Sequence, residues 1–215
     1  MSKSKDVILF KGKSRRYTMQ DYENKLRKAN KERKNENMLN VEEWADTLWN
    51  ECGLCDIYSP TPIIKIAKKF GFEVFQTPQL RQKYDGIICV DSPEYVKQKY
   101  ERLILVDAFK ELQHQRFVIA HELGHYLFEY LGSNFEEEHM EFVRPYEKNN
   151  HVDLAEQQAN RFASCILMPS NIFAAEYNNL VSQGKDNFYI TRYLARFFEV
   201  KDESIQKRKK EVLER

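Results

Sequence analysis

The sequence of 215 residues predicts an α+β fold in which a small sheet precedes a series of helices. Two short runs rich in aliphatic residues, DGIICV (85–90) and RLILVD (102–107), predict neighbouring buried strands. After residue 108 the apolar spacing becomes helical, and after a polar loop over 132–153 it is helical again. Hydrophobic residues make up 42% and charged residues 31% of the chain, which is typical of a globular protein and argues against a disordered or fibrous one.

The first 40 residues differ in charge from the rest of the chain. They contain 12 Lys and Arg against 5 Asp and Glu, whereas the remainder contains 22 against 28. We therefore predict a basic N-terminal arm at 1–40, either a polar helix or a partly ordered segment, with no packed core. A solvated tail accounts for its charge more simply than a binding role. The overall net charge of +1 gives no reason to expect nucleic acid or a membrane as a partner.

The lack of a recognisable targeting signal and the small number of cysteines both favour a cytoplasmic protein. No run approaches the roughly 18 apolar residues of a membrane span, and the N-terminus has too few apolar residues for a secretory signal. Four cysteines are too few to cross-link a chain of this length, so we expect reduced thiols. Cys52 and Cys55 form a CxxC pair, which we interpret as incidental, because neither a redox setting nor a second pair of metal ligands accompanies it.

The helices and strands follow one another in a clear order. The apolar side chains of VEEWADTLWNEC share one helical face, so a domain of 41–180 is expected to start there. The next helix begins at Pro62, with Thr61 as its cap, and ends near Gly71. The short β-rich run FEVFQ follows and leads to the two strands.

Helices dominate the second half of the chain. Apolar spacing predicts one long helix over 109–130, then a polar loop over 132–153, and a helix over 153–167 that stops before Pro169. Two further helices are expected around 190–198 and 202–213, as a C-terminal pair (181–215) that packs on the domain.

The long helix contains the run HELGH, in which His121 and His125 are one helical turn apart. At this chain's composition, roughly 0.01 matches to HExxH are expected by chance. The two imidazoles are about 40° apart around the helix and about 6 Å apart along it, so both can reach one metal ion. Glu122 lies off their line, where it can hold a water molecule instead of the metal.

A catalytic zinc ion needs a third protein ligand and an open fourth position. Glu156 on the next helix is the leading candidate, and Asp153, His139 and His151 are its competitors. Asn160, one turn after Glu156, is spaced to orient a ligand histidine from outside the metal shell.

The simpler interpretation of HELGH is a helix that contains two histidines by chance. Two features argue against it. Gly124 lowers helix stability by up to about 1 kcal/mol in an otherwise apolar helix, which indicates that a close approach of backbone or metal matters there. Glu122 would also be costly to bury without a partner.

With these blocks the chain resembles the ImmA/IrrE family of metallopeptidases over about residues 60–215. The resemblance rests on the blocks PIIKIAKKFG, DGIICV, RLILVD, RFVIAHELGHYLF, EQQANRFASCILMP and LARFFEVKDESIQKR. The pairing of HELGH with ExxANxFAxxxLMP is its most specific part, and it supports Glu156 as the third ligand. The basic arm matches none of these blocks, and Asn160 stands where many gluzincins have Asp.

The resemblance implies a zincin-like α+β domain whose small sheet packs on the HExxH helix. It also implies a zinc-dependent endopeptidase that cleaves a transcriptional repressor of a phage or mobile element, with Glu122 as general base. An edge strand from the 85–107 region could hold the substrate by β-augmentation. The residue that stabilises the oxyanion stays open among His114, Arg116, His139, Tyr146 and His151.

The alternative function is a non-proteolytic regulator that binds DNA or protein and keeps zinc only for structure. The closing segment resembles a helix-turn-helix with a basic second helix. We prefer packing on the domain or substrate selection for this segment over contact with DNA, because one basic helix alone is a weak signal for nucleic acid. The intact Glu122 favours the enzyme, since a structural zinc site has no use for it.

Overall fold

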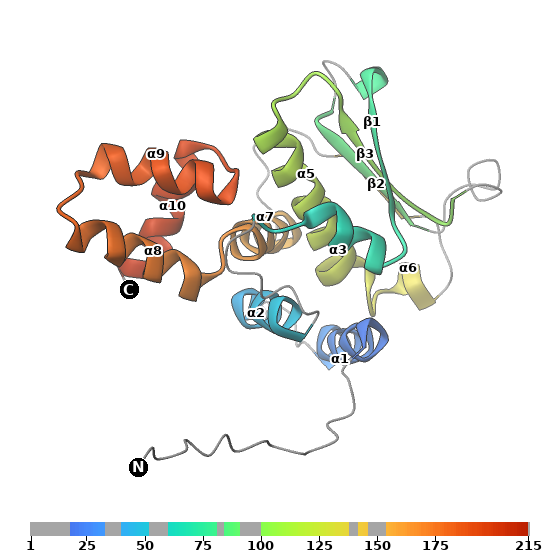
Figure 1. Cartoon of the computed structure of the whole chain (residues 1–215). Helices are drawn as coiled ribbons and strands as arrows, with labels where there is room; N and C mark the ends of the chain where they lie inside the picture. The colour runs from blue at the N-terminus through green and yellow to red at the C-terminus, as the bar shows by residue number, and fades with distance from the viewer. Residues whose placement is uncertain are drawn as a thin grey trace, which may run out of the picture.

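The computed structural model describes residues 18–32, 40–51, 60–80, 84–90, 100–137, 142–145 and 154–214. These residues form a mostly helical molecule with one small mixed sheet (Figure 1), so the predicted α+β fold is confirmed. Within the described part of the chain, no helix is long and apolar enough to cross a membrane.

The helices are α1 (Met19–Glu32), α2 (Val41–Glu51), α3 (Ile63–Lys69), α5 (Leu112–His125), α6 (Asn134–Glu137), α7 (Leu154–Leu167), α8 (Ser170–Ser182), α9 (Asn187–Phe198) and α10 (Asp202–Leu213). A 3-10 turn spans Pro78–Leu80, and a π-helical turn over Tyr126–Tyr130 extends α5. The strands are β1 (Glu73–Thr77), β2 (Gly86–Val90), β3 (Arg102–Asp107) and β4 (Phe142–Pro145).

The sheet has the strand order β1-β3-β2-β4, with β1 parallel to β3 and β2 antiparallel to both β3 and β4. The strands predicted at 85–90 and 102–107 are β2 and β3. Both are paired on either side, so the expectation that this region offers an edge strand to a substrate is wrong. Among the described strands the edges belong to β1 and β4. The predicted loop 132–153 contains β4 and the short helix α6, which are too brief to give a sequence signal.

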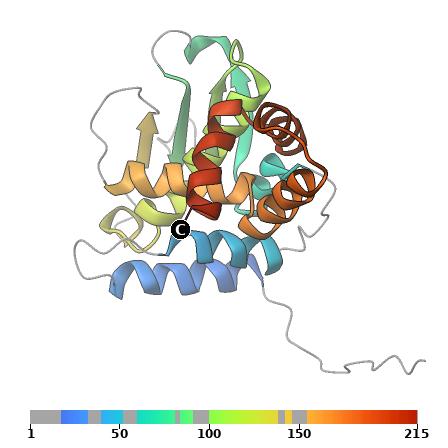
Figure 2. The same cartoon turned by 90° about the vertical axis from the view of Figure 1, so that its left-hand side faces the viewer.

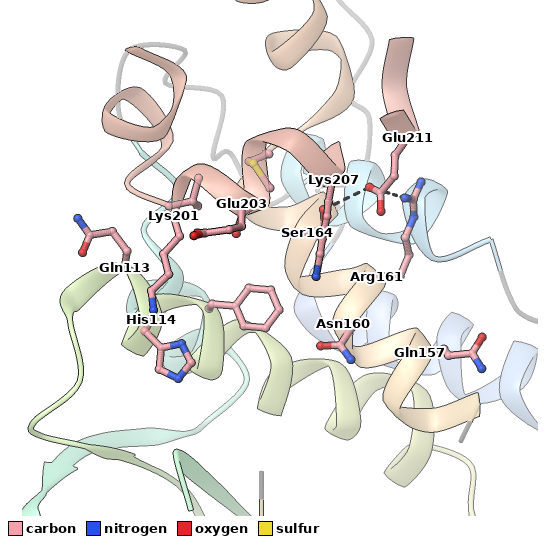
Figure 3. Close-up of a pocket in the computed structure, with 14 residues that line it drawn as sticks. Gln113, His114, Gln157, Asn160, Arg161, Ser164, Lys201, Glu203, Lys207 and Glu211 are labelled. Carbon is pink, nitrogen blue, oxygen red and sulfur yellow. Dashed lines mark hydrogen bonds and ion pairs between the residues drawn. The ribbon is translucent and has the colours of Figure 1, made fainter. Parts of the chain in front are cut away.

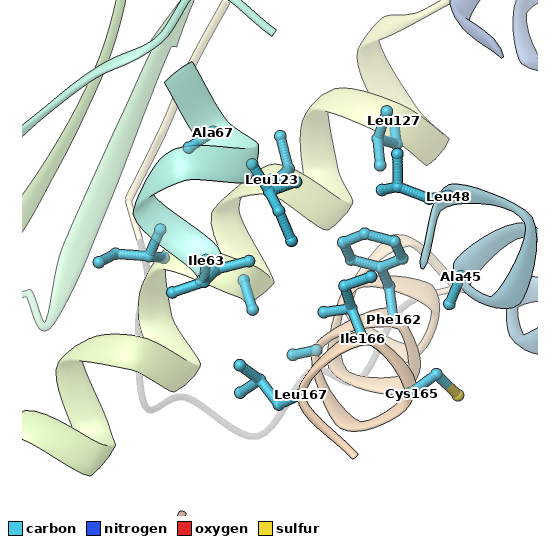
Figure 4. Packing of buried hydrophobic residues seen from close by; sticks show 14 of the residues in the cluster. Ala45, Leu48, Ile63, Ala67, Leu123, Leu127, Phe162, Cys165, Ile166 and Leu167 are labelled. Atoms are coloured by element: carbon cyan, nitrogen blue, oxygen red, sulfur yellow. The ribbon is translucent and has the colours of Figure 1, made fainter. Parts of the chain in front are cut away.

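Helix α5 lies between the sheet and α7, and its buried apolar side chains form part of the core. Figure 4 shows Leu123 of α5 and Leu127 of the π-helical turn facing Phe162 and Ile166 of α7, with Leu48 of α2 beside them. The helix begins at Leu112, later than predicted, and Phe109 before it is exposed.

Helix α1 corrects the expectation for the N-terminal arm. Tyr22 and Leu26 are fully buried in the core, and the Oη of Tyr126 donates a hydrogen bond of 2.6 Å to Glu23. The expectation of no packed core is therefore wrong for Met19–Glu32. The few apolar residues of this helix all share one face, which the average charge of the arm conceals. The remaining residues of the arm, 1–17 and 33–39, lie outside the described residues.

The C-terminal segment contains the predicted pair α9 and α10 and, before it, a further helix, α8. The sequence of α8, SNIFAAEYNNLVS, is rich in Asn, and the helix buries only Phe173 and Leu180, so its helical signal is weak. Figure 2 shows α10 lying across α7. There the fully buried Arg208 donates to the carbonyl oxygen of Met168 at 2.9 Å and pairs with Glu42 of α2 at 2.9 Å. These contacts hold α10, and with it α8 and α9, against the rest of the molecule.

Two of the four cysteines lie among the described residues, so only part of the prediction for the thiols can be compared with the structure. Cys165 is a free thiol, and burial raises its pKa to about 11. Cys52 and Cys55 lie outside the described residues, so the interpretation of the CxxC pair stays a prediction.

Candidate metal centre

The structure brings His121 and His125 of α5 together with Glu156 of α7, and one ligand atom of each lies within 4.8 Å of the others. The two Nε2 atoms are 2.9 Å apart, and the Glu156 oxygens lie 3.4 Å from Nε2 of His121 and 3.2 Å from Nε2 of His125. Zinc bonds of about 2.0–2.1 Å in tetrahedral geometry separate neighbouring ligand atoms by about 3.3 Å. The three side chains therefore have the spacing that one zinc ion requires.

Gly124 explains why the two helices can approach so closely. A Cβ atom at this position would lie 2.8 Å from the Cα of Ala159 in α7, closer than such atoms pack. The backbones of α5 and α7 are thus in direct contact at the level of the site. The prediction that Gly124 marks a close approach is confirmed, and the partner is the backbone of the helix that carries Glu156.

Each histidine is held from behind through its Nδ1 atom. Nδ1 of His121 contacts Oδ1 of Asn160 at 3.1 Å, and Nδ1 of His125 contacts Oε2 of Glu129 at 2.8 Å. Such outer contacts fix the rings and direct Nε2 toward the shared point. Asn160 lies where the sequence places it. Glu129 was missed, although it stands one helical turn after His125.

The electrostatics of the cluster favour a positive charge. Burial lowers the pKa of His125, but hydrogen bonds to Glu129 and Glu156 outweigh it and raise this pKa to about 9, with the nearby charge of Glu122 adding to the effect. Carboxylates thus surround the two imidazoles. The donor set, its spacing and its charge together fit a divalent cation of the zinc type.

Glu122 is fully buried beside this cluster, against the start of β2. A Cβ atom at Gly86 would lie 3.1 Å from Oε1 of Glu122 and 2.2 Å from Cγ1 of Val118. The strand therefore passes directly over the carboxylate, and only glycine leaves room for it. Sequence reasoning assigned no role to Gly86, because a glycine at a strand start usually marks nothing more than a turn.

The other candidates from the sequence fall into two groups. Asp153, His139 and His151, the competing ligands, lie outside the described residues, as does Tyr146. Arg116 points away from the metal centre, since its guanidinium donates to the carbonyl oxygens of Thr61 at 3.0 Å and Glu199 at 3.3 Å. It holds the end of α9 against the body of the molecule.

His114 lies two turns before His121 on α5 and has a different environment. Its Nε2 is 2.7 Å from Oδ2 of the buried Asp85, whose other oxygen is 2.8 Å from the ammonium group of Lys110. Burial alone would raise the pKa of Asp85, but the hydrogen bonds from Lys110 and His114 prevail and lower it. His114 is thereby fixed at the wall of a cleft of about 640 Å³ that lies between α5, α7 and α10 (Figure 3).

Comparisons with known proteins show the family and the fold. The chain matches the protein family described as IrrE N-terminal-like domain over residues 67–210, more than half of its length. A solved structure named "Mycobacterium tuberculosis transcriptional regulator" is 17% identical, with a TM-score of 0.51. That similarity covers 90% of this chain and 53% of the other, so this chain spans about half of that protein, and the likeness extends to the fold alone. Among curated proteins no match is found.

Proposed function

Because this chain belongs to the family of IrrE N-terminal-like domains, Peptidase_M78, we propose that it is a zinc-dependent endopeptidase that cleaves a protein at a specific site. The observation that carries this proposal is the convergence of His121, His125 and Glu156, with the carboxylate of Glu122 buried beside them. Structural zinc sites use four protein ligands, whereas catalytic sites use three and leave one position open. Among the described residues the cluster has three donors, and its position next to a buried carboxylate matches the catalytic type.

The proposed mechanism assigns a task to each side chain. Zinc, when bound by His121, His125 and Glu156, supplies Lewis-acid polarisation of the scissile carbonyl group and acidifies water. Glu122 accepts the proton from the attacking water and passes it to the leaving amine nitrogen. Its burial between α5 and β2 keeps the carboxylate at one place, so the proton moves over a short and fixed path.

A substrate segment would add to the sheet at β4. The described pairing of this strand is with β2 alone, and β2 starts over Glu122. An extended polypeptide beside an edge strand forms main-chain hydrogen bonds without regard to its side chains. Binding there would leave the choice of substrate to other surfaces.

For the substrate we propose a transcriptional repressor in the cytoplasm, as the family resemblance implies. The similar solved structure is named a transcriptional regulator, and this name, which belongs to that protein, is compatible with a regulatory setting. Cleavage at one site is sufficient to inactivate a repressor, so a slow and selective peptidase would serve this role.

Co-expression with candidate transcriptional repressors, chosen from genes near the one that encodes this protein, tests the proposal. We expect a defined fragment with the wild type and intact repressor with Glu122→Gln, a change that keeps the size of the side chain and removes its basicity. Metal analysis of the variant serves as the control, because zinc should stay bound. Cleavage that persists with Glu122→Gln would reject the mechanism.

A further inference from the structure

The cleft between α5, α7 and α10 opens directly beside the metal centre. Phe117 lines it and stacks on the ring of His121, with 6.3 Å between the ring centroids. Asn160 also lines it while contacting Nδ1 of the same histidine. A polypeptide that crosses the metal centre would therefore place a neighbouring side chain in this cleft.

The charged side chains that line the cleft are three basic (Arg161, Lys201 and Lys207) and two acidic (Glu203 and Glu211), an excess of one positive charge among the described residues. Figure 3 shows Lys201 and Lys207 reaching into the cleft, the first toward His114 and the second toward Asn160. Lys207 is exposed, and no acidic group of the described residues lies within ion-pair distance of it. Lys201 is 3.7 Å from Glu111 in a solvent-exposed pair, and such pairs contribute little.

The acidic residues of the cleft leave this excess in place. Arg161 and Glu211 form an ion pair of 2.5 Å and cancel each other. Glu203 on α10 is then the remaining carboxylate among the described lining residues, against the two ammonium groups of Lys201 and Lys207. Polar groups such as Ser164 complete the wall.

The orientation of α10 favours a polypeptide as the occupant. Helices α9 and α10 are joined by the turn 199–201, in which Glu199 has a left-handed backbone (φ 52°), as in a helix-turn-helix. In DNA-binding proteins the N-terminal part of the second helix contacts the bases. Here that part faces Phe117 of α5 and Asn160 of α7 across the cleft, and the buried Arg208 fastens it there. A volume of about 640 Å³ accommodates a few side chains and is too small for a duplex.

We propose that this cleft is a specificity pocket that binds an Asp or Glu side chain of the substrate, a few residues from the scissile bond. Lys207 is the main recognising group and Lys201 the second. The proposal rests on the proposed function, because it assumes that a polypeptide crosses the metal centre.

The test separates binding from cleavage. Zinc-loaded Glu122→Gln protein is incubated with a pool of random synthetic dodecapeptides, and the bound peptides are isolated by gel filtration and sequenced by mass spectrometry. The same experiment uses Lys207→Glu in the Glu122→Gln background. Lys210→Glu is the matched control, since this exposed lysine lies on the same helix outside the cleft. In parallel, the active protein is given a proteome-derived peptide library and its cleavage sites are aligned.

We expect Asp and Glu to be enriched at one position of the bound peptides by about threefold to fivefold, the range of a single exposed ion pair. The enrichment should disappear with Lys207→Glu and persist with Lys210→Glu. Acid-selective binding without any cleavage would reject the proposed function and keep the pocket. Cleavage without acid preference, a preference unchanged by Lys207→Glu, or no peptide binding at all would overturn the pocket. Binding of a fluorescein-labelled 30-base-pair DNA duplex that depends on Lys207 would also overturn it, in favour of a DNA-binding surface.

Discussion

The metal centre and the cleft beside it are built from the same two helices in opposite ways. At the metal centre His121, Glu122 and His125 are buried, and the backbones of α5 and α7 touch. In the cleft a third helix, α10, stands across the gap, and its Lys207 is exposed. The side chains with a proposed chemical task are thus fixed by packing, whereas those proposed to recognise the substrate are exposed and can be replaced without disturbing the fold. Specificity could therefore diverge while the chemistry is kept.

Of the changes that test the difference between the two regions, replacement of Arg208 is expected to have the largest effect. Replacing it with Met removes a fully buried cation and leaves Glu42 without one of its partners, which should lower the free energy of unfolding by about 3 kcal/mol. Chemical denaturation measures the loss. Because Arg208 fastens α10 and not the metal ligands, the folded variant should still bind one zinc ion while its acid preference weakens. Loss of zinc at conditions where the variant is folded would show that the two regions are not independent.

Gly124→Ala tests the close contact of α5 with α7. The new methyl group would lie 2.8 Å from a backbone atom of Ala159, which cannot move as a side chain can, so we expect a destabilisation of about 1–3 kcal/mol despite the better helix propensity of Ala. Separation of the helices should also move Glu156 from the histidines and weaken zinc binding. Thermal unfolding with and without zinc measures both effects. Unchanged stability would contradict the close packing.

Asn160 tests the outer support of the metal ligands. Asn160→Ala removes the contact to Nδ1 of His121 and should weaken zinc affinity roughly tenfold, the lower end for such partners. Asn160→Asp restores a stronger acceptor and should bind zinc at least as well as the wild type. Competition with a zinc chelator gives the affinities. Equal affinities in all three proteins would mean that Asn160 does not orient the histidine.

The smallest expected effect concerns the ion pair between Arg27 of α1 and Glu136 of α6. Burial raises the pKa of Glu136, but the hydrogen bonds from Arg27 and the backbone of Gly132 prevail and lower it. A lowered folded pKa contributes stability that is present above the unfolded pKa of about 4.3 and is lost as the pH falls through the folded value. Glu136→Gln should therefore lower stability by about 1 kcal/mol at pH 7 and by less near pH 3, as urea titrations would measure. Glu32→Gln, in the exposed pair with Lys28, is the control and should change little at either pH.

Much of the site could be predicted because helix geometry is regular. The spacing of His121 and His125 directs both rings to a shared point, and the spacing of Glu156 and Asn160 places them one turn apart on one face of the next helix, where Glu156 approaches that point and Asn160 contacts Nδ1 of His121. The two inner strands and the close approach at Gly124 could also be predicted, since each has a direct local signal.

The missed features depend on the tertiary structure. The burial of Tyr22 arises only when α1 meets the core, and β4 becomes a strand through its pairing with β2. The room that Gly86 leaves for Glu122 depends on where the sheet lies on α5. Glu129 is the exception, because its spacing of one helical turn from His125 is itself a local signal in the sequence.

Zinc stoichiometry tests the central claim most directly. We predict one zinc ion per chain in the purified wild type and in Glu122→Gln, and none in the double variant His121→Ala/His125→Ala, as measured by elemental analysis alongside circular dichroism to verify folding. Glu122 lies beside the ligand set and not within it, so its loss should leave the metal bound. Full zinc content in the double variant, or a folded wild type that binds no zinc, would contradict the assignment of this metal centre.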